Sequence, residues 1–203
     1  MNRGFRLIRA VLALVLVATS PGLLKSQVPA SNVSTVPQAK SWSGRLASPD
    51  GRYVLYGVAF EPGVNDSPQL WIQQTFTGTK RLLFNLSRTI TAQWAPDSTA
   101  FFVNDEFASD GTEAYIYEVP SFNRLKVSQN ILAADSSARN YARGHAYFDA
   151  DGWLGSKRIA VRFHGHTDNS PVTCFEFRYI ITRDGTVTKG AEVVGPIGQV
   201  PCS

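Results

Sequence analysis

The chain has 203 residues, with 20 lysine and arginine residues against 16 aspartate and glutamate residues, and a formal net charge of +4. Four of the basic residues and none of the acidic ones fall within residues 1–26, so the remainder carries 16 of each sign. Because a nucleic-acid-binding surface needs an excess of basic side chains to displace counterions from phosphates, this balance argues against a nucleic-acid partner.

Residues 1–26 have the order of parts found in a secretory signal peptide. Arg3, Arg6 and Arg9 precede an uninterrupted apolar run at residues 10–18, and small or helix-breaking residues follow. This run is shorter than the about 20 residues that a membrane-spanning helix needs. We therefore expect cleavage, a secreted or periplasmic protein and no stable membrane span afterwards. An uncleaved anchor is the alternative.

The rest of the chain is predicted to form one domain. Residues 27–41 are polar and contain two prolines, which is typical of a linker or an irregular lead-in. In residues 42–203, short runs rich in aromatic and β-branched residues alternate with Gly, Pro, Asp and Ser turns. This texture predicts an all-β domain. One short helix is expected at residues 131–142, ended by Gly144.

A repeated strand–turn unit organises the predicted domain. The turn sequence SPDG at residues 48–51 precedes an apolar run, and APDS at residues 95–98 precedes another, 47 residues later. Proline fixes φ in such a turn and aspartate accepts a hydrogen bond from the backbone. Paired strands are expected at residues 70–72 and 115–117. A third, degenerate copy begins at Trp153.

The pattern resembles the WD-like propeller repeats of the TolB and tricorn-type families over roughly residues 42–126. The resemblance implies propeller-like blades of antiparallel strands, about three in number. Residues 154–156 stand in the third copy where the Pro–Asp pair is expected. Closed propellers have about 4–8 blades. The blades would therefore form an open arc, be completed by a second chain, or gain a partial blade from residues 27–42.

Cys174 and Cys202 are expected to form a disulfide that ties the C-terminal tail to a strand. An even number of cysteines is typical of exported chains, in which disulfides persist. Two unpaired thiols are the alternative. The tryptophans recur near the predicted blade starts and strands, which favours packing between blades over an exposed platform for a ligand. They are Trp42, Trp71, Trp94 and Trp153.

His164, His166 and Asp168 form the most tempting metal-binding pattern, HxHxD, and His145 is the one other histidine. Two ligands close in sequence without an assured third seldom bind zinc, so a polar turn is favoured and no metal or cofactor is predicted. Residues 149–152 resemble the start of a calcium loop but lack its later ligands. A second acidic group is expected to be a solvated loop: Asp105, Glu106, Asp110 and Glu113.

No catalytic residues are predicted. The chain lacks Gly-x-Ser-x-Gly and a phosphate-binding glycine loop. The sequence therefore favours an exported, non-enzymatic binding or scaffold module with TolB-like blades. Its partner would be a protein, a peptide or an envelope component, and a homo-oligomer is an option. A small secreted metal protein or hydrolase centred on His145, His164 and His166 is the alternative. A purely structural part of a larger assembly is another.

Overall fold

A computed structural model describes residues 44–59 and 67–197. The expected signal peptide, the linker at residues 27–41 and Trp42 lie outside the described residues. Among the residues that are described, no helix combines the length and apolar character that crossing a membrane requires.

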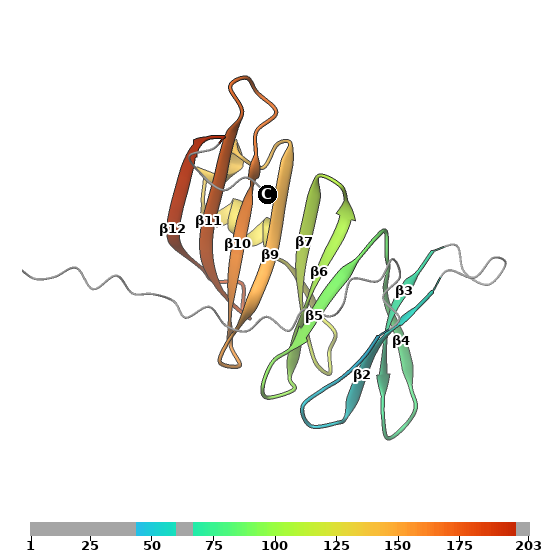
Figure 1. Cartoon of the computed structure of the whole chain (residues 1–203). Coiled ribbons are helices and arrows are strands. Elements are labelled where there is room, and N and C mark those ends of the chain that lie inside the picture. The colour runs from blue at the N-terminus through green and yellow to red at the C-terminus, as the bar shows by residue number, and fades with distance from the viewer. Residues whose placement is uncertain (1–43, 60–66, 198–203) are drawn as a thin grey trace, which may run out of the picture. The chain divides into compact units, whose positions relative to one another are not determined.

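The described chain is built of three successive four-stranded antiparallel meanders, which we call the first, second and third blades (Figure 1). The first blade contains β1 (Arg45–Ala47), β2 (Tyr53–Val58), β3 (Gln69–Gln74) and β4 (Lys80–Asn85). The second contains β5 (Ile90–Trp94), β6 (Ala100–Ala108), β7 (Gly111–Glu118) and β8 (Arg124–Lys126). The third contains β9 (His145–Leu154), β10 (Arg158–His166), β11 (Thr173–Thr182) and β12 (Val187–Pro196). The predicted all-β class and the propeller-like blades are confirmed.

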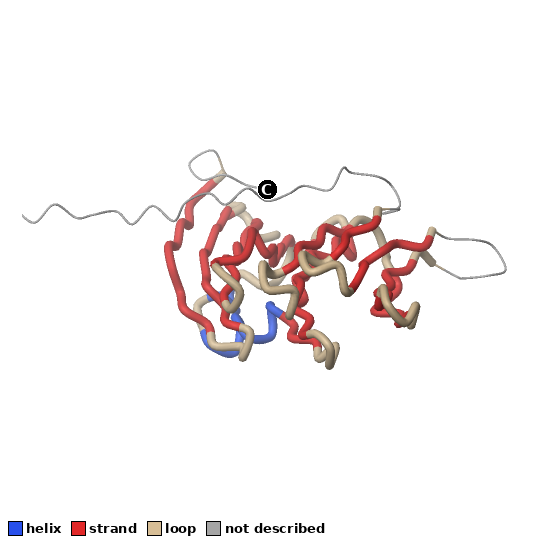
Figure 2. Tube along the Cα trace, turned by 90° about the horizontal axis from the view of Figure 1, so that it is seen from below, coloured by secondary structure: helices blue, strands red, loops and turns tan. Residues whose placement is uncertain are grey.

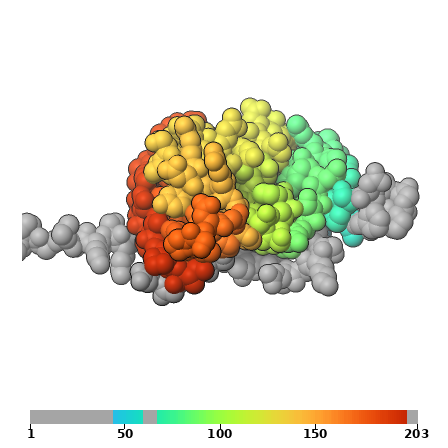
Figure 3. All heavy atoms as spheres, turned by 90° about the horizontal axis from the view of Figure 1, so that it is seen from above, coloured from blue at the N-terminus to red at the C-terminus, as the bar shows by residue number. Residues whose placement is uncertain are grey.

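The second and third blades share one sheet, whereas the first forms a sheet of its own. The link is a short parallel pairing of β7 with β9, in which Gly111 lies opposite Ala146 and Thr112 opposite Tyr147. The space-filling view shows these two blades packed side by side (Figure 3).

The two Pro–Asp turns have the same backbone hydrogen bonds. The Ser48 N–H donates to the Tyr53 carbonyl at 2.8 Å, and the Ala95 N–H donates to the Ala100 carbonyl at the same distance. Both turns join the first strand of a blade to its second strand. The repeat predicted from the turn sequences is therefore a repeat of structure.

The aspartates of these turns also have equivalent roles. Asp50 Oδ1 accepts from the Arg52 N–H at 3.0 Å, and Asp97 Oδ1 accepts from the Thr99 N–H at 3.1 Å. Each carboxylate thus satisfies a backbone donor that the corner would otherwise leave without a partner.

The third blade repeats the pattern without a Pro–Asp pair. In every blade, the residue after the third strand donates its N–H to a carbonyl in the blade's first hairpin turn. The pairs are Thr75 to Arg52 at 2.8 Å, Val119 to Thr99 at 2.9 Å and Arg183 to Lys157 at 3.1 Å. Gly155, with a φ of +70°, supplies in the third turn the positive φ that Gly51 and Ser98 supply in the first two turns. The predicted third copy is thus present.

Two tryptophans join the second and third blades to the blade before each. Trp94 Nε1 donates to the Leu46 carbonyl in β1 at 3.1 Å, and Trp153 Nε1 donates to the Gln93 carbonyl in β5 at 3.1 Å. Leu46 and Gln93 are both the next-to-last residue of their blade's first strand. The two indoles are 6% and 8% exposed, so they pack between blades.

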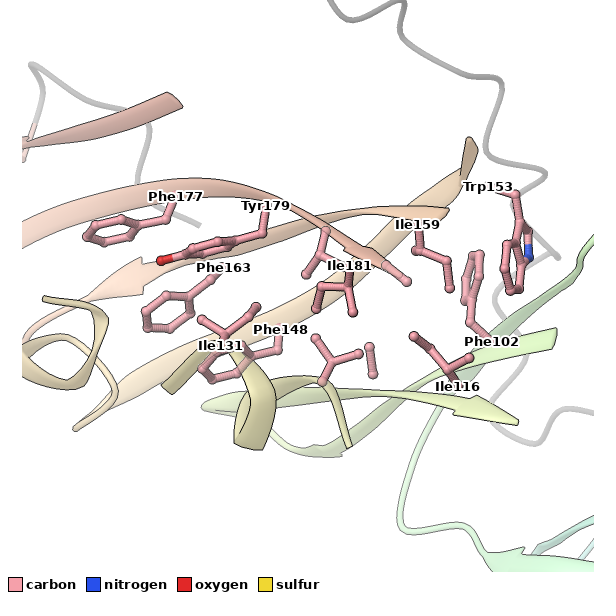
Figure 4. Packing of buried hydrophobic residues seen from close by; sticks show 14 of the residues in the cluster. Phe102, Ile116, Ile131, Phe148, Trp153, Ile159, Phe163, Phe177, Tyr179 and Ile181 are labelled. Atoms are coloured by element: carbon pink, nitrogen blue, oxygen red, sulfur yellow. The ribbon is translucent and has the colours of Figure 1, made fainter. Parts of the chain in front are cut away.

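Apolar clusters fill the two junctions between blades. At the first junction, Leu55 and Ile72 of the first blade join Phe101 of the second blade in one cluster. At the second junction, Phe102 and Ile116 lie against the third blade (Figure 4). Here Phe148, Phe163, Phe177, Tyr179 and Ile181 supply much of the third blade's contribution.

The helical segment differs from the prediction. The α-helix α1 (Val127–Ala134) follows β8 directly, and a short 3-10 helix, η1 (Ala138–Asn140), comes after it. Side chains of both belong to the cluster of the second junction. Figure 2 shows the helical segment in blue. The α-helix ends at Asp135, whose extended backbone stops it and whose carboxylate accepts from the Ser137 N–H at 2.9 Å. Gly144 therefore does not cap this helix.

We predict that the aspartate of the second turn matters more than an aspartate in an ordinary hairpin. Replacing Asp97 with Ala should lower the free energy of unfolding by about 1 kcal/mol, because the Thr99 N–H loses its acceptor. Asp110 is exposed between β6 and β7, and Asp110→Ala should cost less than about 0.5 kcal/mol. Denaturant midpoints of both variants measure the difference. Equal losses would contradict the equivalence of the repeated turns.

The disulfide stays a prediction. Cys174 lies in β11 and is fully buried, whereas Cys202 lies outside the described residues. A bridge would require the two Cα atoms to lie within about 7 Å and would stabilise the fold by about 3.5 kcal/mol on the chain-entropy model. Non-reducing peptide mapping of the exported chain should recover one peptide that joins both positions. Recovery of free thiols at both would refute the pairing.

Candidate functional site

The two end blades each carry a face that points away from the second blade. Along the strands of a blade, side chains alternate between the two faces, so the residues opposite the junction clusters follow from the strand register. The two end faces differ in chemistry, and they are the candidate binding surfaces of the chain.

The face of the first blade is aromatic and uncharged at its centre. Tyr56 of β2 lies opposite Trp71 of β3, and Trp71 lies opposite Leu82 of β4. Tyr56 and Trp71 are half-buried and Leu82 is 40% exposed. The Arg45 guanidinium lies over the Tyr56 ring at 5.4 Å, and Trp71 Nε1 donates to Gln69 Oε1 at 3.0 Å. We call this surface the aromatic face.

The face of the third blade opposite the second junction is polar. Its side chains lie in cross-strand register on β9, β10 and β11, opposite the phenylalanines of the second junction. We call it the polar face and define it by His145, Tyr147, Asp149, Asp151, Arg162, His164, His166, Glu176 and Arg178.

Ion pairs cover the centre of the polar face. Arg162 lies 3.7 Å from Asp149 and 3.6 Å from Asp151. Arg178 reaches Asp151 at 3.3 Å and Glu176 at 2.6 Å. Burial raises the pKa of Asp151 above its usual range, although both arginines oppose that rise. The two aspartates that resemble the start of a calcium loop therefore belong to an ion-pair network on the sheet.

His164 belongs to the same network. Its Nε2 lies 2.7 Å from Asp149 Oδ2, and its ring stacks on Tyr147 with ring centres 5.3 Å apart. The buried imidazole is thus fixed between an aromatic ring and a carboxylate. This is a structural position, and it sets His164 apart from the other two histidines.

His145 and His166 meet at the end of the polar face. They are direct cross-strand partners, and their rings stack with centres 4.1 Å apart. Asp168 Oδ1 lies 3.9 Å from His145 Nε2, and one ligand atom from each of the three residues falls within 4.8 Å of the others. Of the three histidines in the alternative interpretation, the structure brings His145 and His166 together, and Asp168 lies beside them in place of His164.

Two glycines allow this close approach. A Cβ atom on Gly165 would lie 1.9 Å from the His145 carbonyl oxygen, and one on Gly144 would lie 2.6 Å from Asp168 Oδ2. Both glycines have a positive φ, +147° and +94° respectively. A larger residue at position 165 would push β10 away from His145, and one at position 144 would displace the Asp168 carboxylate.

The contacts of the ring Nδ1 atoms favour one tautomer in both histidines. His145 Nδ1 lies 3.5 Å from the Tyr147 hydroxyl, whose own proton goes to the Ser109 carbonyl at 3.0 Å. His166 Nδ1 lies 3.4 Å from the Thr167 carbonyl. Protons on both Nδ1 atoms leave the Nε2 lone pairs available.

The prediction of a solvated loop is wrong for half of the second acidic group: Glu106 and Asp110 are exposed, but the other two residues are buried. Asp105 and Glu113 face each other across β6 and β7 and are 7% and 4% exposed. Glu113 accepts from the Ser128 N–H at 3.0 Å and from the Ser128 hydroxyl at 2.5 Å at the start of α1. Burial raises the pKa of Asp105 to about 6, helped by the negative charges of Glu113 and Glu106.

A groove of about 530 Å³ lies at the turn end of the second and third blades and is lined by Glu118, Lys157, Thr182, Arg183 and Asp184. Arg183 donates to both carboxylate oxygens of Glu118, at 2.6 and 2.7 Å, and to the Thr99 carbonyl at 3.1 Å. Its guanidinium thus ties the two blades together, which makes the groove a part of the junction.

Solved structures similar to the chain include β-propeller proteins. No protein-family model matches it, and no curated protein matches it. It is similar to the β-propeller domain of the trilobed protease from Pyrococcus furiosus, with a TM-score of 0.48 and 18% identity over 75% of this chain and 43% of that one. It is also similar to TolB from Acinetobacter baumannii, with a TM-score of 0.36 and 13% identity over 79% and 44%.

A putative TolB from Agrobacterium tumefaciens gives a TM-score of 0.37 and 15% identity over 80% of this chain and 52% of that one. The chain thus spans about half the length of these structures. The likeness concerns the fold alone.

The pKa of Asp105 predicts a specific pH dependence of stability. A carboxyl whose pKa is higher in the folded state favours folding while it is protonated, so its effect is lost as pH rises through about 6. Asp105→Asn should therefore raise the free energy of unfolding at pH 8 by about 1–3 kcal/mol and change it little at pH 4. Urea unfolding at both pH values measures this. A variant no more stable than the parent at pH 8 would contradict it.

Proposed function

We propose that this chain is an exported, non-enzymatic binding module whose aromatic face docks a partner protein. The observation that carries the proposal is the row formed by Tyr56, Trp71 and Leu82 across three strands of the first blade. On the other face of this blade, Leu55 and Ile72 are buried at the first junction. A blade in this chain thus covers an apolar face with a neighbour, and the aromatic face is suited to the same kind of contact.

The composition of the aromatic face supports a protein as the ligand. Tyrosine, tryptophan and arginine are the side chains enriched at the centres of protein interfaces. Arg45 and Lys80 are the charged residues of this face by strand register, and its register positions carry no carboxylate. The partner surface would therefore be apolar at its centre with acidic residues around it.

Leu82 offers a direct test. A photo-crosslinking amino acid at position 82 of the exported chain should link to a partner protein in cells, and Trp71→Ala should reduce that product at least about tenfold, as loss of an interface hot spot does. Phe76 is 97% exposed and lies in the hairpin between β3 and β4, so position 76 is the matched control.

Equal crosslinking from positions 76 and 82 would contradict the proposal, and so would a product at 82 that Trp71→Ala leaves unchanged. A product with twice the mass of the chain would instead show that the aromatic face binds a second copy.

A further inference from the structure

We propose that His145, His166 and Asp168 bind a divalent first-row transition metal ion, with zinc as its representative. The site lies on the third blade, at the end of the polar face, and the proposal is independent of a partner on the first blade. The spacing of the histidines and Asp168 along the chain does not by itself predict this metal site.

The distances suit such an ion. Zinc bonds to imidazole nitrogen and carboxylate oxygen at about 2.0–2.2 Å, so neighbouring ligand atoms in a tetrahedron are about 3.3–3.6 Å apart. His145 Nε2 and Asp168 Oδ1 are already 3.9 Å apart, and all three ligand atoms lie within 4.8 Å of one another. The Asp168 side chain is 65% exposed and the two imidazole rings are stacked with centres 4.1 Å apart, so rotation of the carboxylate and of the rings would bring the three ligand atoms onto one ion.

The backbone around the three residues is arranged for proximity. His145 and His166 come from adjacent strands, and Asp168 comes from the loop that follows β10. Gly165 lets β10 approach the His145 carbonyl, and Gly144 makes room for the Asp168 carboxylate. A Cβ atom at either glycine position would collide with a residue of the same cluster.

The outer contacts orient the histidines as ligands. The Tyr147 hydroxyl and the Thr167 carbonyl lie beside the two Nδ1 atoms, which leaves the Nε2 atoms as the ligand atoms, and His145 Nε2 is the atom nearest to Asp168. A ligating histidine commonly has its other ring nitrogen bonded to such an oxygen, and this contact fixes the tautomer and the ring orientation.

The donor set selects the class of metal. Two imidazoles and one carboxylate suit zinc, iron, cobalt or manganese, whereas calcium and magnesium prefer oxygen ligands alone. Three protein ligands leave at least one coordination position for water or for a group from a bound molecule. The metal would therefore keep a coordination position that is accessible from solvent, because the site lies on a partly exposed surface.

The test is a calorimetric titration of the full exported chain with Zn²⁺ after treatment with a chelator. The parent should bind one equivalent. His145→Gln, His166→Gln and Asp168→Asn should each weaken binding at least about tenfold, which is the smallest loss expected even for an outer contact. His164→Gln is the matched control, because His164 lies on the same strand and face but contacts Asp149. It should leave the affinity within about threefold.

Near-UV circular dichroism of all four variants establishes that each is folded, and glutamine and asparagine are chosen because they preserve side-chain size. Tyr147→Phe adds a test of orientation, with an expected loss of about tenfold. Absence of saturable Zn²⁺ binding in the parent would overturn the proposal. An equal loss in His164→Gln and His166→Gln would do the same, as would tighter binding of Ca²⁺ than of Zn²⁺.

Discussion

The fold depends on how each blade is held to the one before it. At both junctions a tryptophan at the end of a blade's first strand donates its indole N–H to the first strand of the preceding blade, at 3.1 Å. A four-stranded meander buries too little by itself, so its apolar face needs a neighbour. The indole supplies apolar area and a directed bond in one side chain. The phenylalanine and isoleucine clusters then fill the space that these contacts define.

Three blades with two such junctions leave two end faces, and these faces are not interchangeable. The aromatic face resembles the side of a blade that is normally covered. The polar face carries Asp149, Asp151, Glu176 and their two arginines, and dry packing of another blade would bury this charge network at a high desolvation cost. Continuation of the row of blades is therefore more favourable at the first blade than at the third. This asymmetry underlies the assignment of a protein partner to one end and an ion to the other.

Local chemistry explains which features the sequence predicts well. The Pro–Asp turns, the strands behind them and the third copy at Trp153 follow from short motifs whose backbone consequences are nearly context-free. The helix predicted at residues 131–142 lies too far along the chain. The apolar spacing continues beyond Asp135, where the extended backbone ends α1. The sequence does not reveal that Asp105 and Glu113 are buried, because their neighbours depend on the pairing of β6 with β7 and, for Glu113, on Ser128 of α1, which lies 15 residues away in the chain. The sequence does not show which histidines lie together, because the register of β9 and β10 decides the neighbours of each one. Gly165 was the available signal, because a glycine within a strand marks a close backbone approach.

A single bulge in β9 connects the junction with the polar face. From His145 to Asp151, odd-numbered residues of this strand point to the polar face, and Phe148 and Ala150 point to the junction. Strict alternation would send Trp153 to the polar face as well. The register shifts between Ala160 and Val161 of β10, however, so that Asp151 is the extra residue and Trp153 pairs with the buried Ile159. The same strand can therefore place a histidine at the candidate metal site and a tryptophan against the second blade. Such bulges re-aim side chains near functional sites, and here the extra residue, Asp151, itself joins the ion pairs of the polar face.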